Sequence, residues 1–384
     1  MGNPGASDSK PAPPLRPGDP IPWFGVPANS NPDFKIHSVA GFYVVLCFFG
    51  TAADPERLAR LKGLLAYRKL FDDKKLMLFA VATDDAKQPA GTYRDGLPGV
   101  RFFFDRDETL SRRFRPADGA GVTYVLDPTL RVLAAVRFDE PLGHDALIGK
   151  ILTGLPPQDG HANTELTAPA LLVPRVLEPE LCRRLIETYE SGQSEDSGFM
   201  REKDGKTVAM LDHTFKRRND VRIADEALRK TLMERVTQRL VPEIHKAFQF
   251  RASRMERYLV ACYDAEPGGY FKAHRDNTTK GTAHRRFAVT INLNAGEYEG
   301  GDLRFPEFGS RLYRAPTGGA VVFSCSMLHE AMPVTKGRRY AFLPFLYDET
   351  AAQIRAANNE HLGEGVTPYT QGDKPRGSPP KAQT

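Results

Sequence analysis

The chain of 384 residues is poor in cysteine and has no long apolar run. Its four cysteines lie far apart and form no CxxC pair, which excludes a disulfide framework and a zinc ribbon. The apolar runs at residues 41–49 and 320–323 are far shorter than the about 20 residues that a membrane-spanning helix needs. Residues 1–22 offer no apolar stretch for a signal peptide. We therefore expect a cytoplasmic protein with no membrane contact.

An excess of charge of one sign is also absent. Lysine and arginine number 53 against 48 acidic residues, which gives a formal net charge of +5. This weak and dispersed charge argues against a nucleic-acid partner. Hydrophobic residues make up 41% and charged residues 26% of the chain, so wholesale disorder is excluded. At roughly 150 residues per domain, the simplest division is into two domains.

Composition suggests where these domains begin and end. Seven of the 30 prolines fall within residues 1–22, so we expect a flexible arm over residues 1–15. Residues 156–165 hold turn formers and no hydrophobic period, and are interpreted as a linker. The expected domains are therefore residues 16–155 and 166–350. Residues 351–384 are expected to form a tail that is largely disordered towards its end.

Strands and helices alternate before the linker. A continuous apolar run predicts a strand buried on both faces, and leucines at helical spacing predict a helix. The expected strands are residues 42–49, 76–82 and 100–104, with a helix at 55–70 and a hairpin formed by 122–126 and 132–138. This order predicts an α/β domain.

The order after the linker differs, because helices come first and short strands follow. The expected helices are residues 178–190 and 225–248, the latter one long helix or two shorter ones. The expected strands are residues 258–262, 287–293, 303–305, 320–323 and 340–345. This order predicts a barrel or jelly roll braced by helices.

Three residues of the second half could share one metal ion. His274 and Asp276 are two residues apart, a spacing that places both side chains on one face of a strand. His329 follows 55 residues after His274. Two imidazoles and one carboxylate form the facial triad that leaves open positions on non-haem Fe(II). Taken singly, His274 and Asp276 are better explained as a solvated loop pair, and His329 as a core histidine at the end of a strand.

Arg339 strengthens the metal interpretation. It lies ten residues after His329 and directly before an apolar run. If Gly337 turns the chain, Arg339 should return on the next strand, beside His329. A guanidinium there could grip a carboxylate through two hydrogen bonds. A dicarboxylic keto acid needs such a cation at one end and the metal at the other.

These motifs, with Gly300-Gly301-Asp302 and the segments 172–177 and 329–340, resemble the prolyl-4-hydroxylase-type 2-oxoglutarate/Fe(II) dioxygenases over about residues 166–348. The resemblance implies a double-stranded β-helix with Fe(II) on His274, Asp276 and His329. Arg339 would bind the distal carboxylate of 2-oxoglutarate, and Tyr263 would line the co-substrate pocket. Asn292 stands where family members often have a second tyrosine.

The resemblance also implies the reaction. Dioxygen would decarboxylate 2-oxoglutarate to succinate and carbon dioxide, with hydroxylation of a second substrate and L-ascorbate as the reductant. That substrate could be peptidyl proline, a free amino acid or another small molecule. Two basic clusters, residues 216–218 and 284–286, are expected to be solvated faces. Alternatively, residues 277–286 form a loop at the mouth of the site that selects an acidic or peptide substrate.

The first half resembles a peroxiredoxin of the thioredoxin fold over residues 16–152, through segments 16–24, 44–49, 78–85 and 104–107. The peroxidatic cysteine of that family is missing, because Arg57 stands in its place. Asp54 is expected to cap the helix that Pro55 begins. Cys47 is expected to be inert core. The half is interpreted as a redox-inactive scaffold that could bind a protein partner.

Two other functions stay open. The chain could be a non-enzymatic binding or sensor protein in which both halves are recognition modules, but an intact triad with Arg339 argues against decay of the site. It could also be a zinc hydrolase using the same three residues, which would leave Arg339 unexplained.

Overall fold

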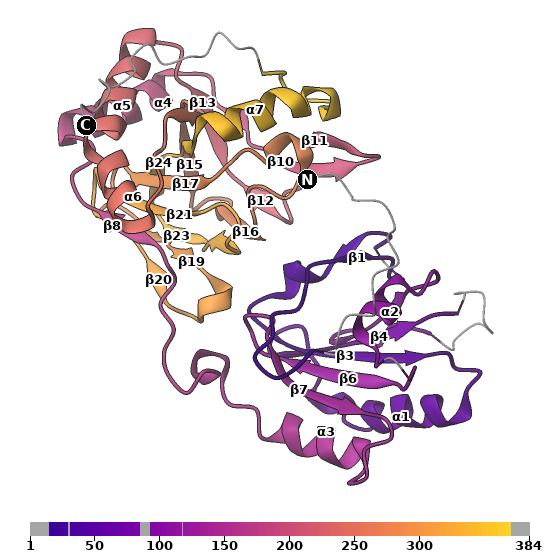
Figure 1. Cartoon of the computed structure of the whole chain (residues 1–384). Helices are drawn as coiled ribbons and strands as arrows, with labels where there is room; N and C mark the ends of the chain where they lie inside the picture. The colour runs from indigo at the N-terminus through magenta and orange to yellow at the C-terminus, as the bar shows by residue number, and fades with distance from the viewer. Residues whose placement is uncertain (1–14, 30, 85–92, 117, 370–384) are drawn as a thin grey trace, which may run out of the picture. The chain divides into compact units, whose positions relative to one another are not determined.

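The computed structural model describes residues 15–29, 31–84, 93–116 and 118–369, and the chain divides into two compact units (Figure 1). The first comprises Met1–Thr167 with Pro306–Ser310, and the second Ala168–Phe305 with Arg311–Thr384. Apart from Leu15, the expected flexible arm lies outside the described residues, as do residues 370–384 of the tail. Within the described ranges, no helix is both long and apolar enough to cross a bilayer.

The first unit is built on a mixed five-stranded sheet of order β5-β4-β3-β6-β7, in which β3, β4 and β5 are parallel and β6 and β7 antiparallel. The strands of this unit are β1 Gly25–Val26, β2 Phe34–Lys35, β3 Tyr43–Gly50, β4 Leu76–Ala82, β5 Val100–Phe104, β6 Val122–Leu126 and β7 Val132–Arg137. Its helices are α1 Pro55–Leu65, α2 Thr109–Phe114 and α3 His144–Thr153, with short 3-10 turns η1 Ile36–Val39, η2 Arg68–Leu70 and η3 Gln158–Gly160. The expected α/β order of elements is confirmed.

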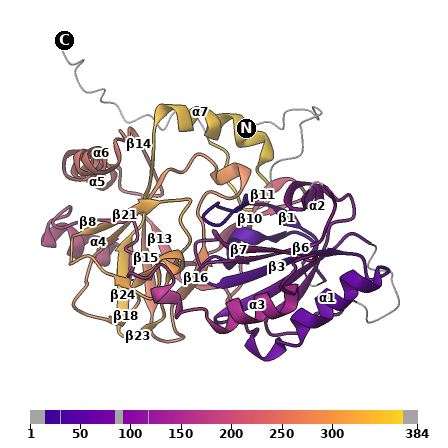
Figure 2. The same ribbon diagram turned by 60° about the horizontal axis from the view of Figure 1, so that its bottom comes forward.

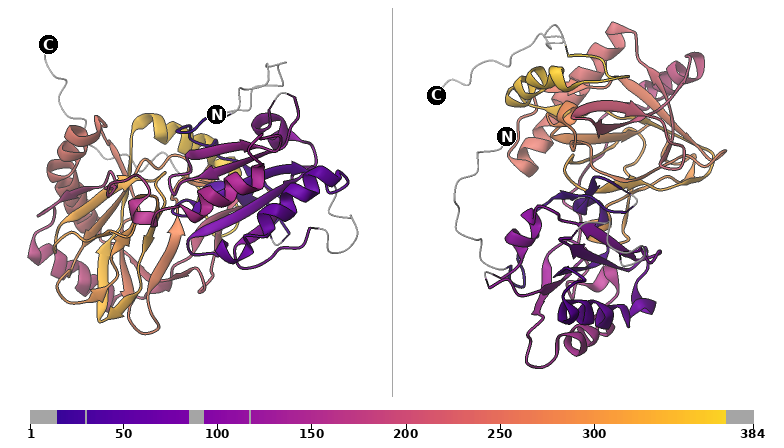
Figure 3. Two further views of the ribbon diagram at one scale, coloured as in Figure 1. Left: turned by 90° about the horizontal axis from the view of Figure 1, so that it is seen from below. Right: turned by 90° about the vertical axis from the view of Figure 1, so that its right-hand side faces the viewer.

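Helices α1 and α3 lie side by side over one face of this sheet (Figure 3). Leu61 and Leu64 of α1 pack in one cluster with Val45, Cys47 and Phe49 of β3. All eight residues of β3 are buried, as its unbroken apolar run predicts. The Asp54 side chain accepts hydrogen bonds from the backbone N–H groups of Glu56 and Arg57, so its predicted role as a helix cap is confirmed.

The second unit contains two larger antiparallel sheets. The nine-stranded sheet runs β14-β25-β17-β24-β15-β13-β9, with β21 paired to β17 and β8 paired to β21, and the five-stranded sheet runs β12-β16-β22-β19-β20. Its strands are β8 Leu171–Val173, β9 Glu195–Asp196, β10 Phe199–Lys203, β11 Lys206–Met210, β12 Lys216–Arg217, β13 Asn219–Arg222, β14 Arg254–Glu256, β15 Leu259–Asp264, β16 Tyr270–His274, β17 Phe287–Asn292, β18 Glu299–Gly300, β19 Leu303–Arg304, β20 Leu312–Tyr313, β21 Ala320–Ser324, β22 His329–Ala331, β23 Val334–Lys336, β24 Arg338–Phe342 and β25 Phe345–Tyr347. Hairpin β10-β11 and the pair β18-β23 stand apart from both sheets.

Helices cover one face of the nine-stranded sheet. They are α4 Pro179–Ser191, α5 Glu226–Arg239 and α6 Val241–Phe248, and Figure 2 shows α5 and α6 together beside β14. Leu185, Leu232 and Ile244 from these helices pack in one cluster with Val260 and Phe342 from the sheet. The opposite face of β15 and β24 therefore carries the residues left for a site, because side chains alternate along a strand.

Proline decides two features of this unit. Residues 225–248 form two helices, because Pro242 at the second position of α6 lacks an N–H and cannot continue α5. The strand expected over residues 340–345 is instead split, since Pro344 separates β24 from β25.

A further helix, α7 Glu349–Ala357, and the turns η4 Lys280–Thr282, η5 Pro306–Phe308 and η6 Asn358–His361 complete the described elements. Helix α7 lies largely within the segment that the sequence assigns to the tail.

Candidate metal centre

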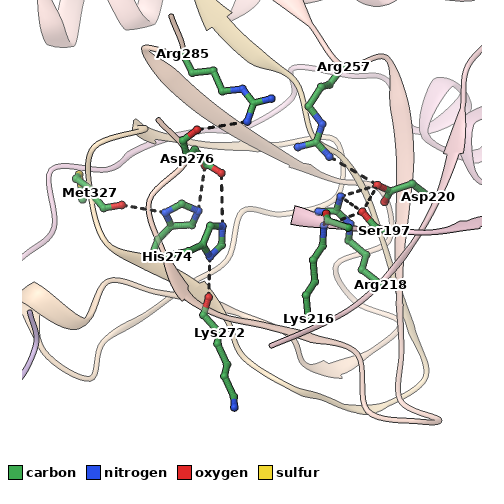
Figure 4. Close-up of polar contacts among 12 residues, drawn as sticks. Ser197, Lys216, Arg218, Asp220, Arg257, Lys272, His274, Asp276, Arg285 and Met327 are labelled. Carbon is green, nitrogen blue, oxygen red and sulfur yellow. Dashed lines mark hydrogen bonds and ion pairs between the residues drawn. The ribbon is translucent and has the colours of Figure 1, made fainter. Parts of the chain in front are cut away.

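The sheet register brings the two histidines of the predicted triad together. His274 ends β16 and His329 begins β22, and the two residues are direct partners across these antiparallel strands. Their ring centroids are 4.3 Å apart. Asp276 follows in the turn after β16, and its carboxylate points towards the His274 ring (Figure 4) and also lies beside Nε2 of His329. One ligand atom from each of the three residues falls within 4.8 Å of the others.

Hydrogen bonds fix which nitrogen of each imidazole faces the Asp276 carboxylate. Nδ1 of His274 lies 2.7 Å from the carbonyl oxygen of Lys272, and Nδ1 of His329 lies 3.0 Å from that of Met327. A carbonyl only accepts, so each Nδ1 carries a proton, and Nε2 is the atom of each ring that can offer a lone pair to a metal. The Nε2 atoms lie 3.6 Å and 3.3 Å from the Asp276 carboxylate oxygens.

The two Nε2 atoms and the Asp276 carboxylate thus converge, and this arrangement suits a cation bound between them. Burial and, after it, the neighbouring His329 lower the pKa of His274 to about 4, although Asp276 acts in the opposite direction, so His274 is neutral at pH 7. Burial alone would raise the pKa of Asp276, but His329 and His274 hold it well below its usual range. Neutral imidazole and ionised carboxylate are the forms that ligate metals. The donor set therefore fits Fe(II) in a two-His, one-carboxylate site.

Arg339 is buried inside the second unit with unpaired donors. It lies on β24 opposite Tyr263 of β15 and is 2% exposed. Within the described residues, its Nε and Nη1 atoms have no hydrogen-bond partner. A buried guanidinium without an acceptor is costly, so an anion is the ligand that this position suits. Arg338, its neighbour, is exposed and pairs with Asp264 and Glu190.

The expected path of the chain to Arg339 is wrong in one respect. Arg339 does not return on a strand beside His329, because β23 intervenes and pairs with β18. Gly337 then turns the chain with a φ of +73°, and β24 joins the nine-stranded sheet, whereas His329 lies in the five-stranded sheet. The two residues thus come from different sheets.

Tyr263 and Asn292 both lie near Arg339. The Tyr263 ring centre is 5.0 Å from the guanidinium carbon of Arg339. Asn292 on β17 is opposite Ala341, two residues beyond Arg339 and on the same face of β24. Its Nδ2 donates to the carbonyl of Ala315 at 2.8 Å, and its Oδ1 is buried and unpartnered among the described residues.

A second tyrosine was missed by the sequence prediction. Tyr298 is 5% exposed, and its hydroxyl has no hydrogen-bond partner in the described part of the chain. A Cβ placed on Gly301 would lie 3.1 Å from Cδ of Arg339 and 3.4 Å from Cε2 of Tyr298, so these two side chains flank the same glycine. The sequence signal is the position of Tyr298 two residues before the Gly300-Gly301 motif.

The expectation that both basic clusters are solvated faces is wrong. Lys216 and Arg218 are buried, and so is His284. Arg285 is half-buried and donates from Nη1 to the backbone carbonyl of Asp276 at 3.4 Å. Short strands and a turn direct these side chains inward, and local charge composition carries no signal for that direction.

Residues 258–347 match the model of the 2OG-Fe(II) oxygenase superfamily. A PKHD-type hydroxylase from Thioalkalivibrio sulfidiphilus is 31% identical over 117 residues, which cover 28% of this chain and 52% of the relative. A PKHD-type hydroxylase from Stutzerimonas stutzeri is 30% identical over 148 residues, which cover 36% and 64%. The chain thus spans less than two thirds of the length of these relatives.

Solved structures show weaker likeness. A Pseudomonas putida prolyl-4-hydroxylase is 18% identical, with a TM-score of 0.35, and the match covers 50% of this chain and 96% of that one. A thiol peroxidase from Chromobacterium violaceum is 17% identical, with a TM-score of 0.29, and the match covers 36% and 87%. The region of the second unit that matches the 2OG-Fe(II) oxygenase superfamily model contains His274, Asp276, His329 and Arg339.

Proposed function

We propose that the second unit is an Fe(II)- and 2-oxoglutarate-dependent oxygenase that hydroxylates a second substrate. One observation carries the proposal: the buried guanidinium of Arg339 has unpaired donors in the same matched region as the triad. A zinc hydrolase using the triad would need no such cation. A dicarboxylic co-substrate needs it, because its far carboxylate must be held away from the metal.

In this proposal each residue has a distinct task. His274, Asp276 and His329 would hold Fe(II), which supplies dioxygen activation when it is bound. Arg339 would bind the distal carboxylate of 2-oxoglutarate, and the Tyr298 hydroxyl would donate to the same carboxylate. Tyr263 would form an apolar wall beneath the guanidinium. The two antiparallel sheets would be the halves of a double-stranded β-helix, whose interior excludes water from the site.

For the first unit we propose a thioredoxin-like fold without thiol chemistry. Cys47 is fully buried, and burial raises the pKa of its thiol to about 12. A thiol with this pKa is not a thiolate at pH 7 and cannot attack peroxide. Arg57 at the start of α1 is engaged by Asp54 at 3.0 Å and by backbone carbonyls.

The experiment that tests the oxygenase proposal is succinate formation from 2-oxoglutarate under air. Parallel samples contain Fe(II), Fe(II) with ascorbate, Zn(II) or no metal. Succinate is expected only with Fe(II), and ascorbate should extend turnover by keeping the iron reduced. Equal activity with Zn(II), or no succinate with any metal, would sink the proposal.

A further inference from the structure

Four cationic side chains gather beside the triad. Lys216 and Arg218 come from β12 and the residue that follows it, Arg257 precedes β15, and Arg285 precedes β17. Figure 4 shows Arg285 above Asp276, and Lys216, Arg218 and Arg257 around Asp220. Lys216 is 4% and Arg218 5% exposed, whereas 26% of the Arg257 side chain is exposed. The cluster is thus mostly buried but reachable at Arg257.

Few carboxylates balance these cations. Asp220 pairs with Arg218 at 2.6 Å and is shared with Arg257 at 3.7 Å. Glu256 pairs with Arg285 at 2.7 Å and is shared with Arg355 at 2.8 Å. Both carboxylates therefore serve two cations each.

Among the described residues, Lys216 has only neutral acceptors at hydrogen-bond distance. Its Nζ donates to Oγ of Ser197 at 2.7 Å and to the carbonyl of Gly198 at 2.6 Å. Nε of Arg218 has no acceptor among the described residues. The cluster keeps an excess of positive charge that no described carboxylate neutralises.

The proposed metal and co-substrate do not supply the missing negative charge. Fe(II) and Arg339 together carry as much positive charge as 2-oxoglutarate and Asp276 carry negative charge. That site is balanced by itself, so the excess at Lys216, Arg218 and Arg257 persists when it is full. Buried cations without counter-charges are destabilising unless a ligand pairs with them.

The side chains respond to this crowding. Burial lowers the pKa of Lys216 well below its usual range, and Arg218 lowers it further, while Asp220 and Asp276 oppose the change. Burial and then Arg218 lower the pKa of Arg257 to about 10, again opposed by Asp220 and Asp276. The Nζ atom of Lys216 lies 4.8 Å from the centre of the Phe271 ring, and that ring stacks on the His274 ring with centroids 3.5 Å apart, so Lys216 lies close to the triad.

We propose that the primary substrate is an anion, and that a carboxylate or phosphate group of it binds at Arg257 and Lys216. The inference rests on the proposed oxygenase function and names the substrate class for that same site. The oxyanion would hold the substrate by one end, so that a C–H bond a few atoms away faces the metal. Arg257, which is partly exposed, would meet the substrate first.

The test uses sulfate as the probe oxyanion. The full chain is held under nitrogen with Fe(II) and saturating 2-oxoglutarate, so that Arg339 is occupied. The thermal unfolding midpoint is followed against sulfate concentration, with chloride at matched ionic strength as the reference. The wild type should show a saturable rise with sulfate. Absence of a saturable rise overturns the inference.

Variants locate the binding. Arg257→Gln should lower the affinity for sulfate at least tenfold. Arg257→Lys should keep most of the wild-type affinity, because it keeps the charge. Arg217→Gln is the matched control, since its guanidinium donates to the carbonyls of His213 and Pro267. Arg217→Gln should bind sulfate as the wild type does. Equal affinity in Arg257→Gln and the wild type would show that sulfate binds elsewhere and overturns the assignment.

Competition identifies the kind of oxyanion. Acetate and methyl phosphate are each titrated against bound sulfate, and the tighter competitor names the substrate group. Neutral acetamide should not compete, and competition by acetamide equal to that of acetate overturns the inference. Succinate formation is measured on the same protein preparations after air is admitted, because the reaction consumes dioxygen. Intact succinate formation with no sulfate binding rejects the anionic substrate alone, whereas loss of succinate formation rejects the oxygenase proposal itself.

Discussion

Polar groups near the start of α1 in the first unit are paired with one another, whereas those around Arg339 in the second unit are not. In the first unit, the Thr51 hydroxyl donates to Asp84 at 2.7 Å and the Tyr93 hydroxyl donates to the same carboxylate at 2.6 Å. The backbone N–H of Ala52 donates to the Tyr93 hydroxyl at 2.9 Å. Arg57 donates to the carbonyl of Gly119 at 2.8 Å.

The second unit shows the opposite state. The donors Nε and Nη1 of Arg339, the Tyr298 hydroxyl and Oδ1 of Asn292 are all buried without hydrogen-bond partners in the described residues. Buried polar groups are nearly always hydrogen-bonded, because an unpaired one costs about 1–3 kcal/mol. The hydrogen-bonded groups near the start of α1 need no ligand, because each stabilises the others. The unpaired groups around Arg339 are expected to bind a ligand that supplies the missing hydrogen bonds. This difference separates a stabilising site from a binding site without reference to any relative.

Removing either histidine of the triad should have the largest effect. His274→Ala and His329→Ala each leave two ligands, too few for the facial set, so Fe(II) binding and succinate formation should both be lost. Bound iron is measured by equilibrium dialysis with metal analysis, and folding by the unfolding midpoint. Full iron binding in either variant would show that the metal, if any, lies elsewhere.

Arg339→Ala should have the second-largest effect on activity. The proposed salt bridge to the co-substrate is buried and charge-assisted, and each such hydrogen bond contributes about 1.5–3 kcal/mol, so KM for 2-oxoglutarate should rise at least tenfold. Arg338→Ala is the matched control, because its side chain is exposed and pairs with Asp264 and Glu190. A larger effect at Arg338 than at Arg339 would contradict the assignment.

Tyr298→Phe should have a smaller effect on the same constant. The substitution removes one neutral donor and keeps the ring against Arg314, whose guanidinium carbon is 4.4 Å from the ring centre. A net contribution of about 1 kcal/mol predicts a roughly fivefold rise in KM for 2-oxoglutarate, with folding unchanged. Tyr263→Phe serves as the comparison. An unchanged KM in Tyr298→Phe would show that this hydroxyl does not bind 2-oxoglutarate.

The first unit should show no thiol peroxidase activity. Cys47 is fully buried with a pKa raised to about 12, and the start of α1 carries no cysteine. Peroxide consumption is measured with dithiothreitol, for the wild type and for Cys47→Ser, and both should match the background. Turnover by the wild type that Cys47→Ser abolishes would show that the paired network does permit chemistry.

The sequence predicts elements well where one force dominates. The continuous apolar runs of β3 and β4 and the cap at Asp54 follow from burial and local hydrogen bonding, and all three are confirmed. The prediction that His274 and Asp276 share one face of a strand is wrong, because β16 ends at His274 and Asp276 lies in the turn that follows. The two side chains still meet, because the residues are neighbours along the chain. His329 joins them through strand pairing across 55 residues, which spacing alone does not determine.

Other features depend on which way a side chain turns, and the sequence carries no signal for that. Lys216, Arg217 and Arg218 have the same charge, yet Arg217 turns outward and its two neighbours are buried. The position of Tyr298 beside Arg339 depends on the close approach of Gly301, where a side chain would clash. Both features emerge only from tertiary packing.

The binding of labelled 2-oxoglutarate to the full chain under nitrogen tests the central claim most directly. The account predicts one molecule bound per chain, with affinity that depends on Fe(II) and falls at least tenfold in Arg339→Ala but not in Arg338→Ala. Binding that is indifferent to Arg339, or no saturable binding with Fe(II) present, would contradict the claim that the unpaired groups of the second unit await this ligand.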